Sequence, residues 1–342
     1  MKPLIIESHA MYDLIVHPNF ENIAGNYSGS YSGTLNEFTV YNDVSLSNGT
    51  PIIDIFSKNN NLQRKDASCK TNWKQIAKGS TRKIKIDELY GATEDCQEEF
   101  YQGCLADFSK YSPKFQEMIL NFFKESLGTD LASNSYFGDI SRPDDEEEEW
   151  SWNKFDGIFA KYAKYIEKGG DLKPTVLDAV PEGDISGPQA YAIFKEAYEN
   201  QSYILQGKPG FSKAFYVDWD LANGLKNYYQ QIGANGGIIG YLMNGIPTLM
   251  FEDIPVFVEP IWKPVLTRLN KGKKAHALIL TLRGNFLFGT NKNYGGGKDK
   301  KQALRVWWSE DDEVWRYKMH LTAGTDIATP QHSVLALTEI KN

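Results

Sequence analysis

The search for catalytic chemistry starts with the five histidines, because imidazole is the side chain that titrates near neutral pH. They are His9, His17, His276, His320 and His332, far apart and without an H-x-x-x-H pair. His276 precedes an apolar run and could act as a general base. No acid or nucleophile motif lies near it in the sequence, and no serine stands in a G-x-S-x-G elbow. We therefore interpret His276 as structural and predict no catalytic residues.

An acidic run next to tryptophan suggests a second kind of chemistry. Residues 144–149 are six consecutive carboxylates, followed by Trp150 and Trp152. Calcium loops alternate their ligands with turn-forming glycine, and this run lacks that spacing, so a solvated acidic loop is the favoured interpretation. Glycosidase carboxylate pairs leave no local signature. A carbohydrate-binding or carbohydrate-active protein that uses Trp150, Trp152, Trp307 and Trp308 therefore stays open as the alternative from another class.

Two further patterns carry little chemistry. Residues 295–298 read Gly-Gly-Gly-Lys, but Asp299 stands where a P-loop needs serine or threonine, so we predict a surface loop. The three cysteines, Cys69, Cys96 and Cys104, form neither a disulfide framework nor a zinc motif. We expect reduced thiols, with a Cys69–Cys96 bridge as the alternative. No cofactor and no metal is predicted.

Composition limits the class of protein. The chain has 342 residues, of which 41% are hydrophobic and 13% aromatic, enough for a large packed core. The net charge of −7 argues against a surface that follows nucleic-acid phosphates. Neither a signal peptide nor a membrane-spanning apolar run is evident, so we expect a protein made in the cytoplasm with no membrane partner.

The N-terminal third contains little apolar sequence. Residues 1–48 are rich in Asn, Ser, Gly and Tyr and predict an extended arm. The run 51–56 and the alternating run 81–87 predict two strands that enclose a long polar stretch. That stretch contains Lys58, Arg64, Lys65, Lys70, Lys74 and Lys78. A long basic hairpin is the simplest structure, and loops of this length usually bind something.

Helices and strands alternate irregularly over the remainder, which indicates an α+β fold. Helical patterns begin at Glu94 (through Cys96, Phe100, Cys104 and Phe108), at Ser112-Pro113 with an end near Gly128 or Asn134, at Asp156-Gly157, at Ser186-Gly187-Pro188, and over 220–232. Strands are predicted at 214–217, 249–251, 254–258, 277–281, 284–289, 303–308, 314–321 and 334–337.

Several short segments follow one another in a distinctive order: Phe215-Tyr216-Val217, Tyr241 to Leu249, Ile254-Pro255-Val256, Pro260-Ile261-Trp262, His276 to Thr281, Phe288 to Asn291 and Lys318 to Thr325, with Asp95-Cys96 and Phe137-Gly138-Asp139 upstream. Their order and spacing resemble major capsid proteins of tailed bacteriophages, and in particular those of phages that infect Bacteroidota. The resemblance implies the Hong Kong 97-like capsid fold. It implies an N-terminal arm (1–48), an extended loop (49–92), a peripheral domain with a spine helix (93–185), an axial domain (186–300) and closing strands (301–342).

The resemblance also implies a function. The chain would be a structural subunit of the virion capsid, assembled in the host cytoplasm as hexamers and pentamers around double-stranded DNA. Portal, scaffold and decoration proteins would be its other partners. Encapsulins share this fold and stay open as an alternative, as does a tail or baseplate component. Some family members cross-link Lys to Asn, but no local pattern identifies such a pair here.

Charge suggests which residues meet a neighbouring subunit. Arg64, Lys65, Lys70 and Lys74 concentrate positive charge in the predicted hairpin, and the run 144–149 concentrates negative charge elsewhere. We expect these four cations to form inter-subunit contacts with that acidic run on another copy.

Overall fold

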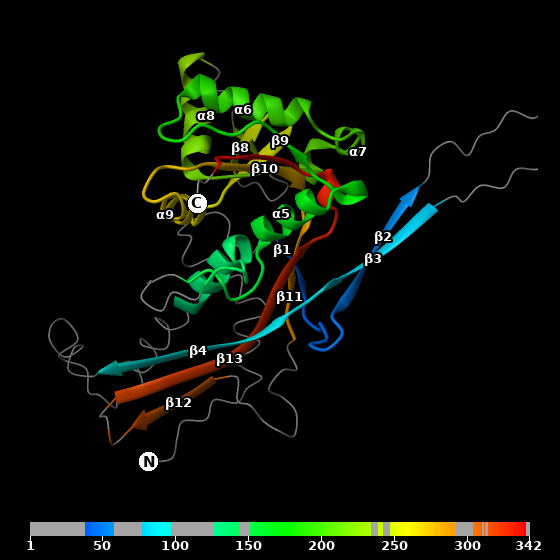
Figure 1. Cartoon of the computed structure of the whole chain (residues 1–342). Coiled ribbons are helices and arrows are strands. Elements are labelled where there is room, and N and C mark those ends of the chain that lie inside the picture. Colours follow the sequence, from blue (N-terminus) through cyan, green and yellow to red (C-terminus); the bar gives the residue numbers. More distant parts are fainter. Residues whose placement is uncertain are drawn as a thin grey trace, which may run out of the picture.

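The computed structural model describes residues 38–57, 77–96, 126–143, 151–233, 239–241, 247–291, 304–309, 311 and 314–339. These residues form a seven-stranded sheet, a five-stranded sheet and a separate two-stranded hairpin (Figure 1). We call the two larger sheets and their helices the body. Within the described ranges, no helix is long and apolar enough to cross a membrane.

The seven-stranded sheet is mixed. Its order is β5-β14-β10-β6-β9-β8-β7, with parallel pairs at β14–β5 and β6–β9. Its central strands β6 and β10 are mostly apolar and buried along nearly their whole length, as expected for a sheet that helices cover on both faces. The strands are β5 (Thr175–Val176), β14 (Val334–Leu337), β10 (Ala277–Leu282), β6 (Lys213–Val217), β9 (Ile254–Val258), β8 (Pro247–Phe251) and β7 (Ile239–Tyr241).

Helices α6 (Gly187–Glu199) and α8 (Trp219–Gln231) cover one face of this sheet (Figure 1). The side chains of Ser186 and Gln189 form a capping box that starts α6, and Asp218 caps α8 through the amides at its first turn. Gly224 lets α8 approach Ala190 of α6 closely. The short helix α7 (Tyr203–Gln206) and two single turns, η1 (Gly170–Leu172) and η2 (Gly210–Ser212), lie in the connections.

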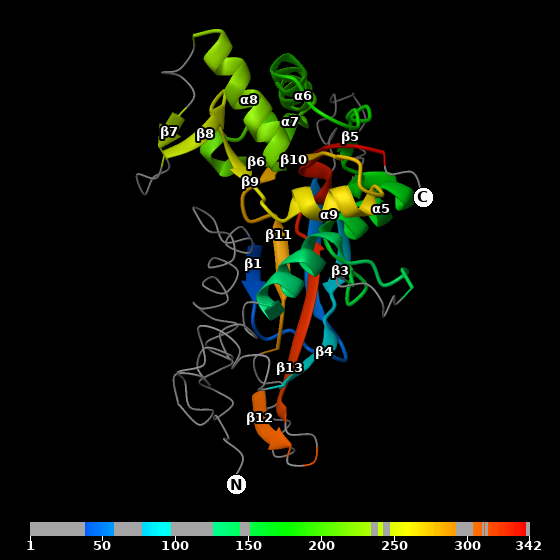
Figure 2. The same ribbon diagram turned by 90° about the vertical axis from the view of Figure 1, so that its left-hand side faces the viewer.

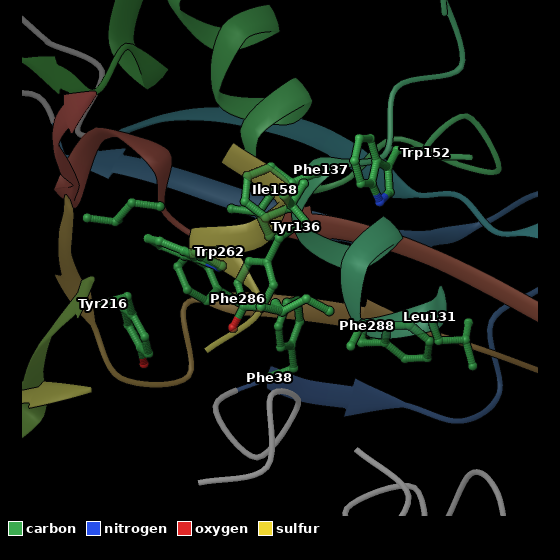
Figure 3. Close-up of a cluster of buried hydrophobic side chains, with 14 of the residues drawn as sticks. Phe38, Leu131, Tyr136, Phe137, Trp152, Ile158, Tyr216, Trp262, Phe286 and Phe288 are labelled. Carbon is green, nitrogen blue, oxygen red and sulfur yellow. The ribbon is translucent and has the colours of Figure 1, made fainter. Parts of the chain in front are cut away.

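The opposite face packs on α5 (Ile158–Lys168), α9 (Trp262–Leu269) and a helical segment at 126–137. Aromatic rings fill this layer (Figure 3). The rings of Tyr136 and Trp262 meet edge-on with their centroids 5.3 Å apart, and the ring centroids of Phe38 and Tyr136 are 5.2 Å apart. Each such ring pair stabilises the fold by about 0.5–1.5 kcal/mol beyond what the burial of its surface area contributes. Because the cluster takes residues from both sheets, it joins them into one body.

The five-stranded sheet is organised around one long strand, β13 (Val314–Ile327). Over 314–323 it pairs with β4 (Asp87–Cys96), and over 314–319 its other edge pairs with β12 (Leu304–Ser309). Its C-terminal end pairs with β11 (Phe286–Gly289), which in turn pairs in parallel with β1 (Phe38–Tyr41). The turn η3 (Pro330–His332) then leads into β14, so a single chain segment passes from one sheet to the other.

The two-stranded hairpin consists of β2 (Thr50–Ser57) and β3 (Ala77–Ile84), paired in antiparallel register over eight residues. It extends away from the body, and β3 and β4 follow one another along nearly the same line (Figure 1). Figure 2 shows β1, β3, β4 and β13 close together below the seven-stranded sheet.

Most of the sequence-based elements are confirmed, including the hairpin strands, α5, α6, α8 and the C-terminal strands. The helix expected from Glu94 is wrong for residues 94–96, which pair with β13, while Phe100, Cys104 and Phe108 lie outside the described residues. The helix expected to stop near Gly128 or Asn134 continues to Phe137. Glycine is required directly after its end, because a Cβ at Gly138 would overlap the carbonyl oxygen of Phe155.

Candidate functional site

The four cations proposed as inter-subunit contacts, Arg64, Lys65, Lys70 and Lys74, lie outside the described residues, as do Cys69, the acidic run 144–149 and the loop 295–298. Residues 1–37 of the predicted arm are also outside. The remainder of that segment packs in the body, because Phe38 and Val44 are buried. The structure does describe the base of the hairpin that carries the four cations, and this base is the candidate site.

The first contact between the hairpin and the body is apolar. Ile84 and Ile86, at the end of β3 and just beyond it, are buried against Val44 and Leu287. Ile52 of β2 and Ala328 complete this small cluster. On the opposite side of the hairpin Ile53 is 68% exposed. The base of the hairpin therefore has an inner face that packs on the body and an outer face that is open.

The second contact is polar and centres on Arg82. Its guanidinium donates to Oδ1 of Asp326 at 3.2 Å, to the Ile327 carbonyl at 2.9 Å and to the Ala328 carbonyl at 2.7 Å. It also donates to the hydroxyl of Tyr165 on α5. The side chains of Arg82 and Asp326 are only 10% and 6% exposed. This buried cation therefore connects the hairpin to β13, to the residue after β13 and to α5.

Tyr165 completes the network. Its hydroxyl accepts from Arg82 and donates to Oδ1 of Asp326 at 2.7 Å. Burial raises the pKa of Tyr165, and the neighbouring charge of Asp326 raises it further, so the hydroxyl keeps its proton. The Asp326 carboxylate also accepts from the Ile327 amide. Arg82, Tyr165 and Asp326 are thus hydrogen-bonded to one another, and a buried ion pair is stable only with such additional hydrogen bonds.

A pair of glycines lets the chain cross the five-stranded sheet beside this network. Gly289 of β11 and Gly324 of β13 stand opposite each other in register. The link between β3 and β4 passes over them: a Cβ on Gly324 would overlap the Lys85 carbonyl oxygen, and one on Gly289 would lie 2.9 Å from Ile84 Cδ1. At Gly324 the overlap is with backbone atoms, so only glycine permits this approach, whereas the contacts at Gly289 are with side chains.

His276 is the strongest catalytic candidate in the sequence, and the structure explains it as structural. It is buried, with Nδ1 at 3.2 Å from Oδ1 of Asp218 and Nε2 at 2.7 Å from the Gly183 carbonyl oxygen. Both ring nitrogens face acceptors, which favours the imidazolium. Burial alone would lower the pKa of His276, but the hydrogen bond and charge of Asp218 outweigh it and raise the pKa. A permanently engaged, inaccessible imidazolium is unsuited to act as a general base.

The same place gives the best candidate for a metal centre in the described part of the chain. Ligand atoms of Asp218, Asp220 and His276 lie within 4.8 Å of one another. Asp218 already accepts from the Asp220, Leu221 and Ala277 amides, and Asp220 pairs with Lys263 at 2.8 Å. An ion would have to displace these partners and the His276 contacts. The cluster is a structural ion pair that caps α8.

The carbohydrate alternative receives no support from the described residues. Trp152 is 6% exposed and belongs to the aromatic core, so its ring face is closed to a sugar. A cavity of about 220 Å³ lies between β4 and the helix at 126–137. Its ionisable lining consists of Tyr90, Asp130 and Lys154, a single carboxylate where glycoside hydrolysis needs two. The side chains of Trp150 and Trp308 lie outside the described residues.

Sequence analysis alone missed Arg82, Asp326 and the two glycines as site residues. Arg82 and Asp326 are separated by 244 positions, and nothing local marks them as partners. Gly289 and Gly324 did leave a signal, since an isolated glycine in a strand pattern indicates a close backbone approach.

Known proteins resemble this chain in structure but not detectably in sequence. No family model matches the sequence, and no curated protein matches it. A chain of the bacteriophage PhiM1 mature capsid matches with a TM-score of 0.52 at 8% identity, covering 92% of this chain and 89% of the other. A chain of the satellite phage P4 procapsid that includes the size determination (Sid) protein matches with a TM-score of 0.51 at 12% identity, covering 93% and 98%. An encapsulin from Synechococcus elongatus matches more weakly, with a TM-score of 0.46 at 9% identity over 89% and 86%.

Proposed function

We propose that this chain, which has the Hong Kong 97-like capsid fold, is the major subunit of an icosahedral phage shell around double-stranded DNA. The observation that carries the proposal is the β2–β3 hairpin, which projects from the body and has a fixed base. In its described part, this hairpin pairs with no other strand and exposes Ile53 on the side away from the body. Its length and its open outer face are accounted for if it packs on another copy of the chain.

In this proposal the shell forms through many moderate contacts between identical subunits arranged as hexamers and pentamers. Symmetric assemblies repeat one contact many times, so weak individual interfaces add up to a stable shell. The fold match to assembled phage capsids supports this assignment. We further propose that a portal, and a scaffold or decoration proteins, act as partners, that assembly takes place in the host cytoplasm, and that packaged DNA is held without sequence-specific contacts.

Electron microscopy of the purified full-length protein tests the proposal. We expect closed, roughly isometric shells in a preparation in which the chain is the major component. Shells that contain DNA when produced with the neighbouring packaging genes would support the phage assignment, whereas shells that contain a specific protein cargo would instead indicate an encapsulin. Tubes with tail-like symmetry, or a monodisperse monomer that binds glycans, would contradict the proposal.

The charge pattern of the hairpin gives a second prediction. We propose that Arg64, Lys65, Lys70 and Lys74 contact the acidic run 144–149 of a neighbour. Replacing Lys65 and Lys70 by glutamate should then abolish or strongly reduce shell formation, because like charges would face each other, while leaving the subunit folded by circular dichroism. Shells of normal yield and diameter from this double variant would refute the pairing. Glutamate at Lys168 and Lys226, exposed cations on α5 and α8, serves as the control for net charge.

A further inference from the structure

The β2–β3 hairpin has no sheet partner in the described part of the chain. Its two strands pair with each other and form a sheet separate from the other two. Two-stranded ribbons are only marginally stable alone, and their backbone bends easily. The direction in which this hairpin leaves the body must therefore be fixed by contacts at its base.

The apolar part of the base cannot fix that direction by itself. The contacts of Ile84 and Ile86 with Val44 and Leu287 come from burial, which is non-directional. Ribbons tilted by some degrees would bury nearly the same area. Hydrogen bonds depend on angle and distance, so the polar contact at the base is the part that can select one orientation.

Arg82 supplies that polar contact in a geometry suited to the task. It lies opposite Ile52 in the hairpin register, so its side chain leaves the ribbon beside the apolar contact. Its acceptors belong to two elements that approach from different sides, Tyr165 on α5 and the Asp326–Ala328 stretch that ends β13. A guanidinium is planar and rigid, so acceptors placed around it restrain rotation as well as position.

We propose that Arg82 is a positioning residue that sets the angle of the β2–β3 hairpin, and through it the geometry with which the hairpin meets a second copy of the chain. The second half of this inference rests on the proposed function, whereas the first half concerns the subunit alone. Tyr165 and Asp326 act through Arg82: the tyrosine hydroxyl holds Oδ1 of Asp326 at 2.7 Å and accepts from the guanidinium, so each group orients the others.

The test compares Arg82→Met with a matched control, Arg316→Met. Arg316 of β13 also forms an ion pair with a neighbouring strand, because its Nε lies 3.1 Å from Oε2 of Glu94 on β4. This pair is exposed and lies far from the hairpin base. In the unassembled Arg82→Met subunit, the rate of hydrogen–deuterium exchange should rise about tenfold or more at residues 50–53 and 81–84. A tenfold rise corresponds to a loss of about 1.4 kcal/mol in the free energy of local opening. The seven-stranded sheet should exchange as in wild type, and Arg316→Met should leave the hairpin unchanged.

Assembly provides the second measurement. Shells of Arg82→Met should show a broad range of diameters or open sheets, whereas Arg316→Met should form shells of wild-type diameter. Wild-type exchange at 50–53 and 81–84 in Arg82→Met would overturn the inference. If wild-type chains form no shells, the proposed function fails while the exchange result still decides whether Arg82 fixes the hairpin.

Two milder variants keep the test decisive if Arg82→Met does not fold. Arg82→Lys keeps the positive charge but cannot reach several acceptors at once, and Tyr165→Phe removes one hydroxyl and no charge. Both are expected to fold and to raise exchange at the hairpin base without raising it in β10. A folded Arg82→Lys with wild-type exchange and shells of wild-type diameter would show that only the charge matters and would refute a positioning role.

Discussion

Replacing Asp218 by alanine is expected to lower the free energy of unfolding by about 3–5 kcal/mol, the range for removal of one partner from a buried ion pair. The carboxylate is fully buried and accepts from three amides as well as from His276. Its loss leaves the imidazolium without a counter-ion and removes the cap of α8. Chemical denaturation of the unassembled subunit, followed by tryptophan fluorescence, measures the change.

Asp220→Ala is the matched control. Asp220 lies two residues away, is an aspartate on the same helix and pairs with Lys263, but its side chain is 21% exposed. Partly exposed pairs contribute about 0–1 kcal/mol, so this variant should stay within that range of wild type. If the two variants are equally destabilised, the buried pair does not carry the energy assigned to it.

The same pair predicts how stability depends on pH. The pKa of His276 is raised above its ordinary value of 6.5. The stability that the His276–Asp218 pair contributes is therefore fully present below pH 6.5 and is lost as the pH rises through the raised pKa. Among the described residues, Asp220, with its partner Lys263, and Asp184, with its partner Lys274, also interact with the charge of the ring. Burial lowers the pKa of His332, so the titration of His332 changes the stability only below pH 6.5.

Asp218→Asn separates the loss of the helix cap from the loss of the negative charge beside His276. The amide oxygen can still cap α8, but the negative charge that holds the proton on His276 is gone. We expect this variant to lose the decline in stability above pH 6.5 that is expected of wild type, and to be less destabilised at pH 8 than Asp218→Ala. An unchanged pH profile in Asp218→Asn would mean that His276 is neutral in the folded chain.

The second large effect is expected for Gly324→Ala. A methyl group at this position would overlap the Lys85 carbonyl oxygen and approach Ile86 Cα to 3.0 Å, and both are backbone atoms that cannot rotate away. Overpacking of this kind costs about 1–3 kcal/mol. The chain can respond only by lifting the 84–86 link off the sheet, so exchange should rise at 84–87 together with the loss of stability.

Gly207→Ala controls for the substitution itself. Gly207 has a φ of −72°, and the nearest atoms to its added methyl group would be 3.6 Å away. It should be neutral to within about 0.5 kcal/mol, as is usual for surface substitutions. If Gly324→Ala is equally neutral, the crossing is looser than described and the glycine pair is not what permits it.

Local patterns in the sequence predicted the elements whose signals are themselves local. Ser186-Gly187-Pro188 marked the start of α6, and the apolar run 277–281 marked the strand β10. The hairpin strands were predicted because an alternating run follows a long polar stretch. The resemblance to tailed-phage capsid proteins predicted the fold that the structural matches support.

Long-range pairing set the limit of prediction. Residues 94–96 have helical spacing to the apolar positions after them, yet their backbone pairs with β13 more than 200 positions away. Arg82 reads as an ordinary polar residue of an alternating strand until β13 and α5 bring Asp326 and Tyr165 to it. The α9 helix was not predicted either, because it has only eight residues and contains a proline, Pro264.

The near alignment of β3 with β4 has a mechanical consequence. A pull along the hairpin passes through residues 85–86 into β4, which is paired antiparallel with β13 over ten residues. The ladder hydrogen bonds run perpendicular to the strands, so this force loads them in shear and they bear it together instead of opening one after another. Tension transmitted along β3 is therefore resisted by the whole β4–β13 ladder at once.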